Sequence, residues 1–152
     1  MKIGMIAPPW FPLPPRRYGG IEFVVSLLTE GLVERGHEVT LFASGDSETG
    51  ARLSAVFTRA PFEQMEDGVH LEVAHSLEAY TMAREFDVIH DHDGVDSRVM
   101  GALVHRLVGT PVVATLHGPA DPTTQQMLSS LRHDLVFIAI SEYQRQGFPD
   151  LR

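Results

Sequence analysis

The side chains best suited to chemistry gather in the segment "HDHDG", from His90 to Gly94. Imidazoles and carboxylates are ligands that zinc or manganese accepts, so a metal-dependent hydrolase is one interpretation of this segment. In an extended chain alternate side chains point to opposite sides, so His90 and His92 should face one way and Asp91 and Asp93 the other. No pair of histidines four residues apart accompanies them as helical ligands would. We therefore interpret the segment first as the polar rim of a cleft in which His92 and Asp93 contact substrate, and we expect no metal site.

A further reactive histidine, His117, closes the apolar run in "PVVATLHGP". Because it ends a predicted strand and precedes Gly118, its imidazole should face a cleft, and the alternative is a packing histidine bonded to backbone. Ser141 in "SEYQ" is interpreted as a helix N-cap, with Gln144 completing a capping box. The remaining histidines are expected to be surface or capping residues: His37, His70, His75, His105 and His133.

The segment "APPWFPLPPRRYGGIE", Ala7 to Glu22, combines five prolines with paired glycines before a helical pattern. Prolines stiffen such a loop, and Gly19 and Gly20 would let an anion or a sugar hydroxyl approach the free N–H groups of a helix start. Arg16 and Arg17 could add cationic donors. A surface turn that needs glycine geometry is the alternative. Trp10 is either a hydrophobic anchor or a stacking surface.

Apolar runs alternate with helical patterns along the chain. The predicted strands are Lys2–Ala7, Glu38–Ser44, Phe86–His90, Pro111–His117 and Leu135–Ile140, with a weaker candidate at Leu53–Phe57. The predicted helices are Ile21–Arg35 before Gly36, Leu71–Arg84, Val95–Val108 before Gly109, and one that starts at Pro122 after an Asp121 cap. Continuously apolar strands joined by helices predict a Rossmann-like, doubly wound parallel α/β sheet with helices on both faces. Ligands then bind at the carboxyl ends of the strands.

The composition restricts the class of protein. A chain of 152 residues predicts one domain, residues 1–152. A formal net charge of −8 argues against a nucleic-acid partner, which requires a basic face. The chain has no cysteine, no convincing signal peptide and no apolar run long enough for a membrane span, so a cytoplasmic location is expected. The G-x-G-x-x-G fingerprint is absent, which disfavours a dinucleotide dehydrogenase.

Taken together, "KIGMIAPP", "YGGIE", "RGHEVTLFAS", "FDVIHDHD", "TPVVATLHGP" and "FIAISEYQR" occur in an order that resembles family 4 glycosyltransferases of the GT-B fold. The resemblance covers almost the whole chain and is to the N-terminal of that family's two Rossmann-like domains. It implies retaining transfer of a sugar from a nucleotide-sugar donor to a small-molecule, lipid or glycan acceptor, without a metal ion or other cofactor.

The resemblance also implies roles for individual residues. The N-terminal domain mostly binds the acceptor, Gly19–Gly20 reaches the donor diphosphate or the reacting centre, and His117 is the catalytic residue beside the transferred sugar. Ser141 and Arg145 match the segment S-E-x-x-R that leads toward the second domain. The remaining substrate-binding residues expected in the matched segments are Arg16, Tyr18, Glu22, His92, Asp93 and Gly118.

The nucleotide-sugar site of the family lies in a C-terminal domain that is absent from this sequence. We therefore expect little or no activity from the chain alone and a missing domain or partner chain as its complement. Its exposed domain face could also support a homo-oligomer. A stand-alone small-ligand binding module that uses the same cleft is the alternative function.

Overall fold

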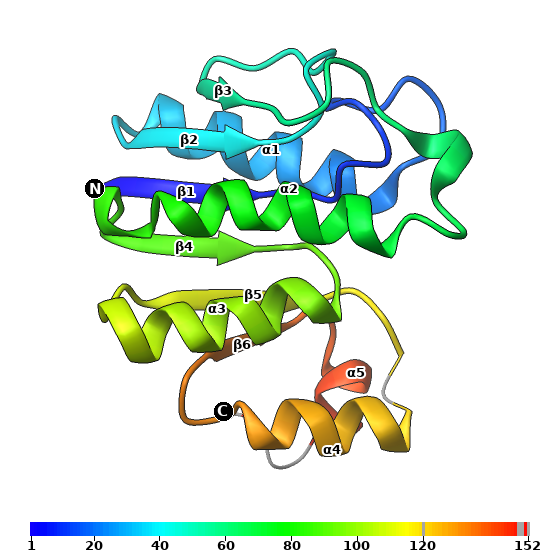
Figure 1. The fold of residues 1–152 in the computed structure, drawn as a ribbon, viewed down its shortest axis with the longest axis vertical. Coiled ribbons are helices and arrows are strands. Elements are labelled where there is room, and N and C mark those ends of the chain that lie inside the picture. Colours follow the sequence, from blue (N-terminus) through cyan, green and yellow to red (C-terminus); the bar gives the residue numbers. More distant parts are fainter. Residues whose placement is uncertain (120, 149–150, 152) are drawn as a thin grey trace.

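A computed structural model describes residues 1–119, 121–148 and 151, and its centre is a six-stranded parallel sheet. The strand order is β3-β2-β1-β4-β5-β6, and every pair of neighbours is parallel. All arrows in Figure 1 therefore point the same way, and their carboxyl ends lie at one edge of the sheet. The strands are β1 (Lys2–Ile6), β2 (Glu38–Phe42), β3 (Arg52–Ser54), β4 (Val88–Asp91), β5 (Val112–Leu116) and β6 (Val136–Ala139).

Helices cover both faces of this sheet, as the sequence predicts. Helix α1 (Gly20–Glu34) lies behind it in Figure 1, whereas α2 (Val69–Thr81) and α3 (Val95–Val108) lie in front. Two shorter helices, α4 (Pro122–Ser130) and α5 (Glu142–Gln146), flank β6, and 3₁₀ turns occupy Phe62–Gln64 and Ala83–Glu85. The Rossmann-like, doubly wound α/β fold is confirmed.

Each sheet face has its own hydrophobic cluster, because alternate residues of a strand point to opposite sides. Met5 and Leu41 pack with Val25 on the α1 side. Ile6 and Ile89 lie in the other cluster, with α2 and α3. The two clusters together fix the register of the central strands, since a shift by one residue would exchange the two faces.

The predicted helix ends are confirmed where local chemistry decides them. Gly36 and Gly109 both adopt φ of 82°, the left-handed conformation that ends a helix, and Asp121 accepts from the N–H groups of Thr123 and Thr124. The predicted helix Leu71–Arg84 is displaced, since α2 spans Val69–Thr81 and a separate 3₁₀ turn follows. The weak strand expected at Leu53–Phe57 is Arg52–Ser54, which pairs with β2 alone.

The proline-rich loop after β1 is anchored to the domain. Trp10 and Leu13 are buried, and a Cβ placed on Gly68 would come within 2.5 Å of the Trp10 ring. Leu13 also accepts from the N–H of Glu48 at 2.6 Å and donates to the Ser47 hydroxyl at 3.0 Å. Trp10 is therefore a hydrophobic anchor, and the stacking interpretation is wrong because its ring is not accessible to a ligand.

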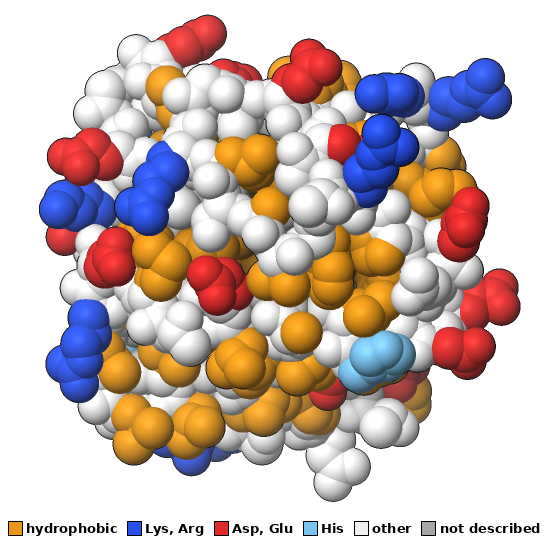
Figure 2. All heavy atoms as spheres, turned by 45° about the horizontal axis from the view of Figure 1, so that its top comes forward, with side chains coloured by type: hydrophobic (Ala, Val, Ile, Leu, Met, Phe, Trp, Pro, Cys, Tyr) orange, Lys and Arg blue, Asp and Glu red, His pale blue; other side chains and the backbone are white. Residues whose placement is uncertain are grey.

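Hydrophobic side chains are also exposed on the surface. Figure 2 shows hydrophobic side chains across the centre and lower part of one face. On α3, Val99, Leu103 and Leu107 are exposed. On β6, Val136 and Ile138 are exposed as well. Such surface is typical of a domain that contacts another protein surface. Within the described part of the chain, no helix combines the length and apolarity that a membrane crossing requires.

The fold predicts unequal effects for two leucine substitutions near α1. Leu41 on β2 is 0% exposed, so Leu41→Ala should lower the free energy of unfolding by about 2–5 kcal/mol. Leu27 on α1 is 61% exposed, so Leu27→Ala should change it by no more than about 0.5 kcal/mol. Urea unfolding monitored by circular dichroism measures both values, and equal effects would contradict the assigned faces of α1 and β2.

Candidate functional site

The strand order places a topological switch point between β1 and β4. The chain leaves β1 toward α1 on one face and leaves β4 toward α3 on the other. Open parallel sheets bind ligands outside the carboxyl ends of the strands at such a point. The loops that follow β1, β4 and β5 carry most of the residues predicted from the sequence.

Three histidines form a row across the ends of β4 and β5. The ring centroids of His90 and His92 are 4.2 Å apart, and those of His92 and His117 are 5.2 Å apart. Nδ1 of His92 lies 3.0 Å from Nε2 of His117, a hydrogen-bond distance. His90 in turn places its Nε2 2.8 Å from the Thr115 hydroxyl on the neighbouring strand. The structure thus brings together His92 and His117, which are 25 residues apart in sequence.

The three imidazoles are electrically neutral near physiological pH. Burial is the main cause that lowers the pKa of His90 to about 4 and that of His92 to about 2. The charge of His117 contributes to both shifts, and that of His90 to the shift of His92. Burial and the Arg98 guanidinium also lower the pKa of His117. This row therefore carries hydrogen-bond donors and acceptors instead of positive charge.

The aspartates of the same segment face the opposite side, as alternation predicts. Asp91 is fully buried and accepts from the Tyr80 hydroxyl, the Ser97 hydroxyl and the backbone N–H of Asp93, each at 2.8 Å. Tyr80 comes close because α3 has a glycine, Gly101, where a Cβ would lie 2.6 Å from the Tyr80 oxygen. Burial raises the pKa of Asp91, and the Arg98 charge counteracts part of that rise.

Asp93 is buried against α2. The Ser76 hydroxyl donates to it at 2.6 Å, and the Glu72 carboxyl lies beside it. Two carboxyl groups can hydrogen-bond only through a shared proton. Burial and this contact raise the pKa of Asp93 well above its ordinary range. Its side chain lies inside the domain and faces away from the three histidines.

The sequence did not identify Arg98, and it identified Gln144 only as part of a capping box. Arg98 is buried in α3, and its Nη2 donates to the carbonyl oxygen of Asp93 at 2.9 Å. The sequence could have indicated Arg98, because its spacing places it on the same buried side of the helix as Gly101 and Ala102. Gln144 has a less local role. Its Nε2 donates to the carbonyl oxygens of Leu116 and Gly118, both at 2.9 Å.

The interactions of Gln144 correct the predicted capping box. Ser141 does cap α5, since its hydroxyl accepts from the N–H of Gln144 at 3.1 Å. In a complete box the glutamine would return to the N–H of Ser141. Instead the Oε1 of Gln144 accepts from the N–H of Ile140, and its Nε2 donates to the carbonyl oxygens of the residues on either side of His117.

A second group of predicted residues lies where α1 begins. Gly19 has φ of 141°, and a Cβ there would lie 2.7 Å from Pro15, so the fold itself requires glycine. At Gly20 a Cβ would meet nothing within 4 Å. Glu22 is buried with its carboxyl close to Gly19, and burial raises its pKa. No side chain caps the start of α1.

The remaining predicted residues are exposed. Arg16 and Tyr18 lie on the loop surface, where the Tyr18 ring meets Phe11 edge-on at 5.9 Å. Arg145 pairs with Glu142 at 2.8 Å, and Gly118 is exposed directly after His117. Their roles in binding stay predictions.

His75 was expected at the surface or at a helix end, and that expectation is wrong. Its side chain is buried, and its Nε2 lies 2.9 Å from the carbonyl oxygen of Ala7. Burial lowers its pKa to about 4, so the neutral ring donates this bond. The contact joins α2 to the start of the proline-rich loop, across 68 residues of sequence.

Among residues 1–119, 121–148 and 151, no group of three histidine, aspartate or glutamate side chains is arranged to hold a metal ion. One ring nitrogen of each histidine in "HDHDG" is hydrogen-bonded on one side of β4, and the aspartates bond hydroxyls on the other.

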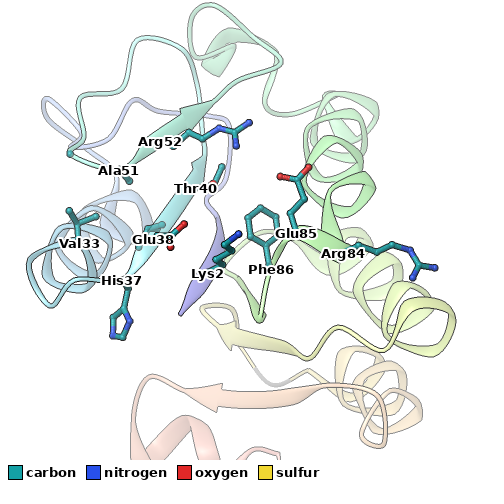
Figure 3. Close-up of a pocket in the computed structure, with 12 residues that line it drawn as sticks. Lys2, Val33, His37, Glu38, Thr40, Ala51, Arg52, Arg84, Glu85 and Phe86 are labelled. Atoms are coloured by element: carbon teal, nitrogen blue, oxygen red, sulfur yellow. The ribbon is translucent and has the colours of Figure 1, made fainter.

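A hollow of about 530 Å³ lies at the opposite edge of the sheet. Figure 3 shows Lys2, Arg52 and Glu85 around it, near the amino ends of the strands. Parallel sheets bind ligands at the other edge, so we assign this hollow no part in the candidate site.

Solved structures with a similar fold include glycosyltransferases. AviGT4, a glycosyltransferase involved in avilamycin A biosynthesis, matches with a TM-score of 0.54 and 23% identity over 98% of this chain and 39% of its own. HepE from Anabaena, in complex with UDP and glucose, matches with a TM-score of 0.63 and 20% identity over 98% of this chain and 40% of its own. HepE in complex with UDP-glucose gives a TM-score of 0.58 at 20% identity, with the same coverage.

These likenesses define the class of fold, a Rossmann-like domain of the kind expected in GT-B glycosyltransferases. The chain spans about two fifths of the length of these structures. The family model of Glycosyltransferase Family 4 matches residues 18–148, and the chain belongs to this family. The comparison with curated protein sequences gives no match.

The two buried aspartates predict opposite responses to amidation. Asp91 accepts three hydrogen bonds, so Asp91→Asn turns an NH₂ group toward donors and should cost about 1–3 kcal/mol of unfolding free energy. In Asp93→Asn the new NH₂ replaces the shared proton toward Glu72 and the amide oxygen still accepts from Ser76. This variant should therefore be at least as stable as the wild type near neutral pH.

The difference for Asp93→Asn should depend on pH with a defined sign. Because its folded pKa is raised, Asp93 binds its proton more tightly in the folded chain, and wild-type stability falls as pH rises from about 4 toward that raised value. The variant lacks this decline, so its stability relative to wild type should increase between about pH 5 and about pH 8. Urea unfolding at both pH values measures the change. A constant difference would contradict the proton shared with Glu72.

Proposed function

We propose that this chain is the acceptor-side domain of a retaining glycosyltransferase that transfers a sugar from a nucleotide-sugar donor, with a UDP-sugar as the first candidate. Membership in Glycosyltransferase Family 4 over residues 18–148 is the observation that supports this proposal most directly. HepE, which has a similar fold, binds UDP and UDP-glucose. The uncapped start of α1 and the histidine row both lie at the carboxyl edge of the sheet, where ligands of this fold bind.

The start of α1 is suited to an anion or a polar oxygen. No side-chain cap bond is made at the N-cap position, Gly19, and the helix dipole adds partial positive charge there. Of the first-turn N–H groups, that of Glu22 bonds the Glu22 carboxyl. Gly20 leaves the approach open, because no side chain covers these groups at that position. In the proposed reaction this end of the helix stabilises negative charge that develops on the leaving diphosphate.

His117 takes the catalytic position in the proposal. It is a half-buried, neutral imidazole at the end of β5, held from below by His92 and from the backbone side by Gln144. A neutral ring can donate a hydrogen bond to a hydroxyl of the transferred sugar or to a phosphate oxygen. The burial and charge that lower its pKa favour this role over that of a cation.

The base and ribose of the donor are assigned in this proposal to a second domain outside residues 1–152. We therefore propose that the chain alone has little activity, and that the exposed apolar surface on α3 and β6 contacts a further domain, a partner chain or a second copy. Transfer needs no metal or other cofactor in this proposal. A cytoplasmic location accords with the absence of cysteine, which excludes disulfides.

The proposed role of α1 predicts a loss of activity without a loss of stability in Gly20→Val. In a two-domain enzyme that contains this chain, the added side chain should obstruct the site and lower kcat on the order of a hundredfold, the size of losing one preorganised donor. The melting temperature should stay nearly unchanged, because a Cβ at Gly20 meets nothing within 4 Å. Release of UDP from UDP-sugars and differential scanning fluorimetry measure the two effects on one preparation.

Gly31→Val on the same helix is the matched control, since a Cβ there meets only the flexible end of Arg35 at 3.9 Å. It should leave activity unchanged. If a folded Gly20→Val enzyme kept wild-type turnover, the glycine pair would have only a structural role, as part of a turn. The absence of sugar transfer by the wild-type enzyme with any nucleotide-sugar would instead favour a binding module.

Metal removal should have no effect on stability or transfer. Incubation with a chelator should leave the melting temperature and kcat unchanged, and added manganese should not raise either. A specific metal at a concentration a hundredfold above its Kd would stabilise the folded state by about 2.7 kcal/mol, which a melting curve resolves. Stoichiometric zinc or manganese in the purified protein would revive the hydrolase interpretation.

A further inference from the structure

The hydrogen bond between His92 and His117 has a direction that the surroundings determine. Both imidazoles are neutral, so across the 3.0 Å contact one nitrogen carries a proton and the other offers a lone pair. Either His92 donates from Nδ1 to Nε2 of His117, or His117 donates from Nε2 to Nδ1 of His92. The two arrangements differ in what they leave at the other nitrogen of each ring.

The far nitrogen of His92 distinguishes them. Nε2 of His92 is buried and has no hydrogen-bond partner among the described residues. If His117 were the donor, His92 would carry its single proton on Nε2, as a buried N–H without an acceptor. Buried N–H groups without partners are rarer in folded proteins than buried acceptors without partners, and each costs about 1–3 kcal/mol.

The charge nearby favours the same arrangement. Arg98 is buried in α3, and its positive charge is the smallest of four causes that lower the pKa of the His92 ring. A positive charge repels the positive end of an N–H group and attracts a lone pair. The Nε of Arg98 also lacks an acceptor, so this part of the interior already holds an unmatched donor. A second unmatched donor on His92 would add to that cost.

We propose that His92 is a positioning residue that donates from Nδ1 to His117 and so fixes His117 in the tautomer with its proton on Nδ1. His117 then presents an Nδ1–H donor to a ligand oxygen, such as a sugar hydroxyl or a phosphate oxygen. With Nε2 occupied, His117 has no free ring lone pair with which to remove a proton from an acceptor. The part of this inference that concerns the ligand rests on the proposed glycosyl transfer, whereas the tautomer itself does not.

The surroundings hold both rings in this arrangement. The His90 ring packs on His92 at a centroid distance of 4.2 Å, and its own Nε2 bonds Thr115. On the other side, Gln144 bonds the carbonyl oxygens of Leu116 and Gly118, which flank His117. Rotation of the His92 ring would break its contact with His90, and rotation of the His117 ring would break its bond to His92. Gln144 holds the backbone on either side of His117.

Nitrogen-15 NMR of the histidine rings in the chain of residues 1–152 tests the tautomer directly. In the wild type at neutral pH, His117 should show a protonated Nδ1 and an unprotonated Nε2, and His92 a protonated Nδ1. In His92→Phe, which keeps a ring but removes the donor, His117 should move toward the mixture of tautomers of a free imidazole. In His92→Asn, whose amide N–H stands near the position of Nδ1, the wild-type tautomer should return.

His105→Asn is the matched control, because His105 bonds the carbonyl oxygen of Thr110 at 3.1 Å, away from His117. It should leave the His117 signals unchanged. A wild-type His117 protonated on Nε2 would overturn the proposal. So would a His117 tautomer that is the same in folded His92→Phe as in the wild type.

Activity in the two-domain enzyme provides a second, separable measurement. His92→Phe should lower kcat on the order of tenfold, as is usual when the partner that orients a working histidine is removed, and His92→Asn should restore most of it. Equal kcat in the wild type and a folded His92→Phe enzyme would overturn the positioning role. If no enzyme transfers sugar while the NMR result holds, the proposed function fails and the tautomer assignment stands.

Discussion

The full burial of the Asp91 carboxyl group is the constraint on which the candidate site depends. A carboxyl group without access to water requires hydrogen-bond donors, and it obtains them from three different segments: Tyr80 on α2, Ser97 on α3 and the backbone of Asp93. These bonds join two helices and the turn after β4 at one point. Because alternate residues of an extended chain face opposite sides, the next side chain, His92, lies on the other face of the sheet, where it meets His117.

The same segment separates two electrostatic environments across the thickness of one strand. On the side of α2 and α3, Asp91 and Asp93 have raised pKa values and lie close to Arg98, Tyr80 and Ser76. On the other side, the imidazoles of His90 and His92 have lowered pKa values. Burial, the largest cause in all four groups, favours the uncharged form of acids and bases alike. The side chains around β4 consequently supply hydrogen-bonding groups and little net charge.

Much of this arrangement follows from local sequence patterns, and the rest does not. Alternation in "HDHDG" predicts the opposite orientations of His92 and Asp93, and Gly109 and Asp121 mark helix ends, because each depends on residues close in sequence. The buried contact of His75 with Ala7 spans 68 residues, and Gln144 reaches Leu116 across 28. A local pattern states which side a residue faces, but not which distant backbone group will meet it there. Trp10 illustrates the same limit, since only the folded chain shows that Gly68 covers its ring.

Gln144 gives the site a mechanical property. The Gln144 side chain accepts from the N–H of Ile140 and donates to the carbonyl oxygens of Leu116 and Gly118. These bonds connect the turn into α5 with the loop that carries His117. A displacement of α5 therefore shifts the backbone that carries the His117 imidazole. Rigid transmission of this kind makes the orientation of His117 sensitive to whatever contacts α5, including groups that never touch the histidine.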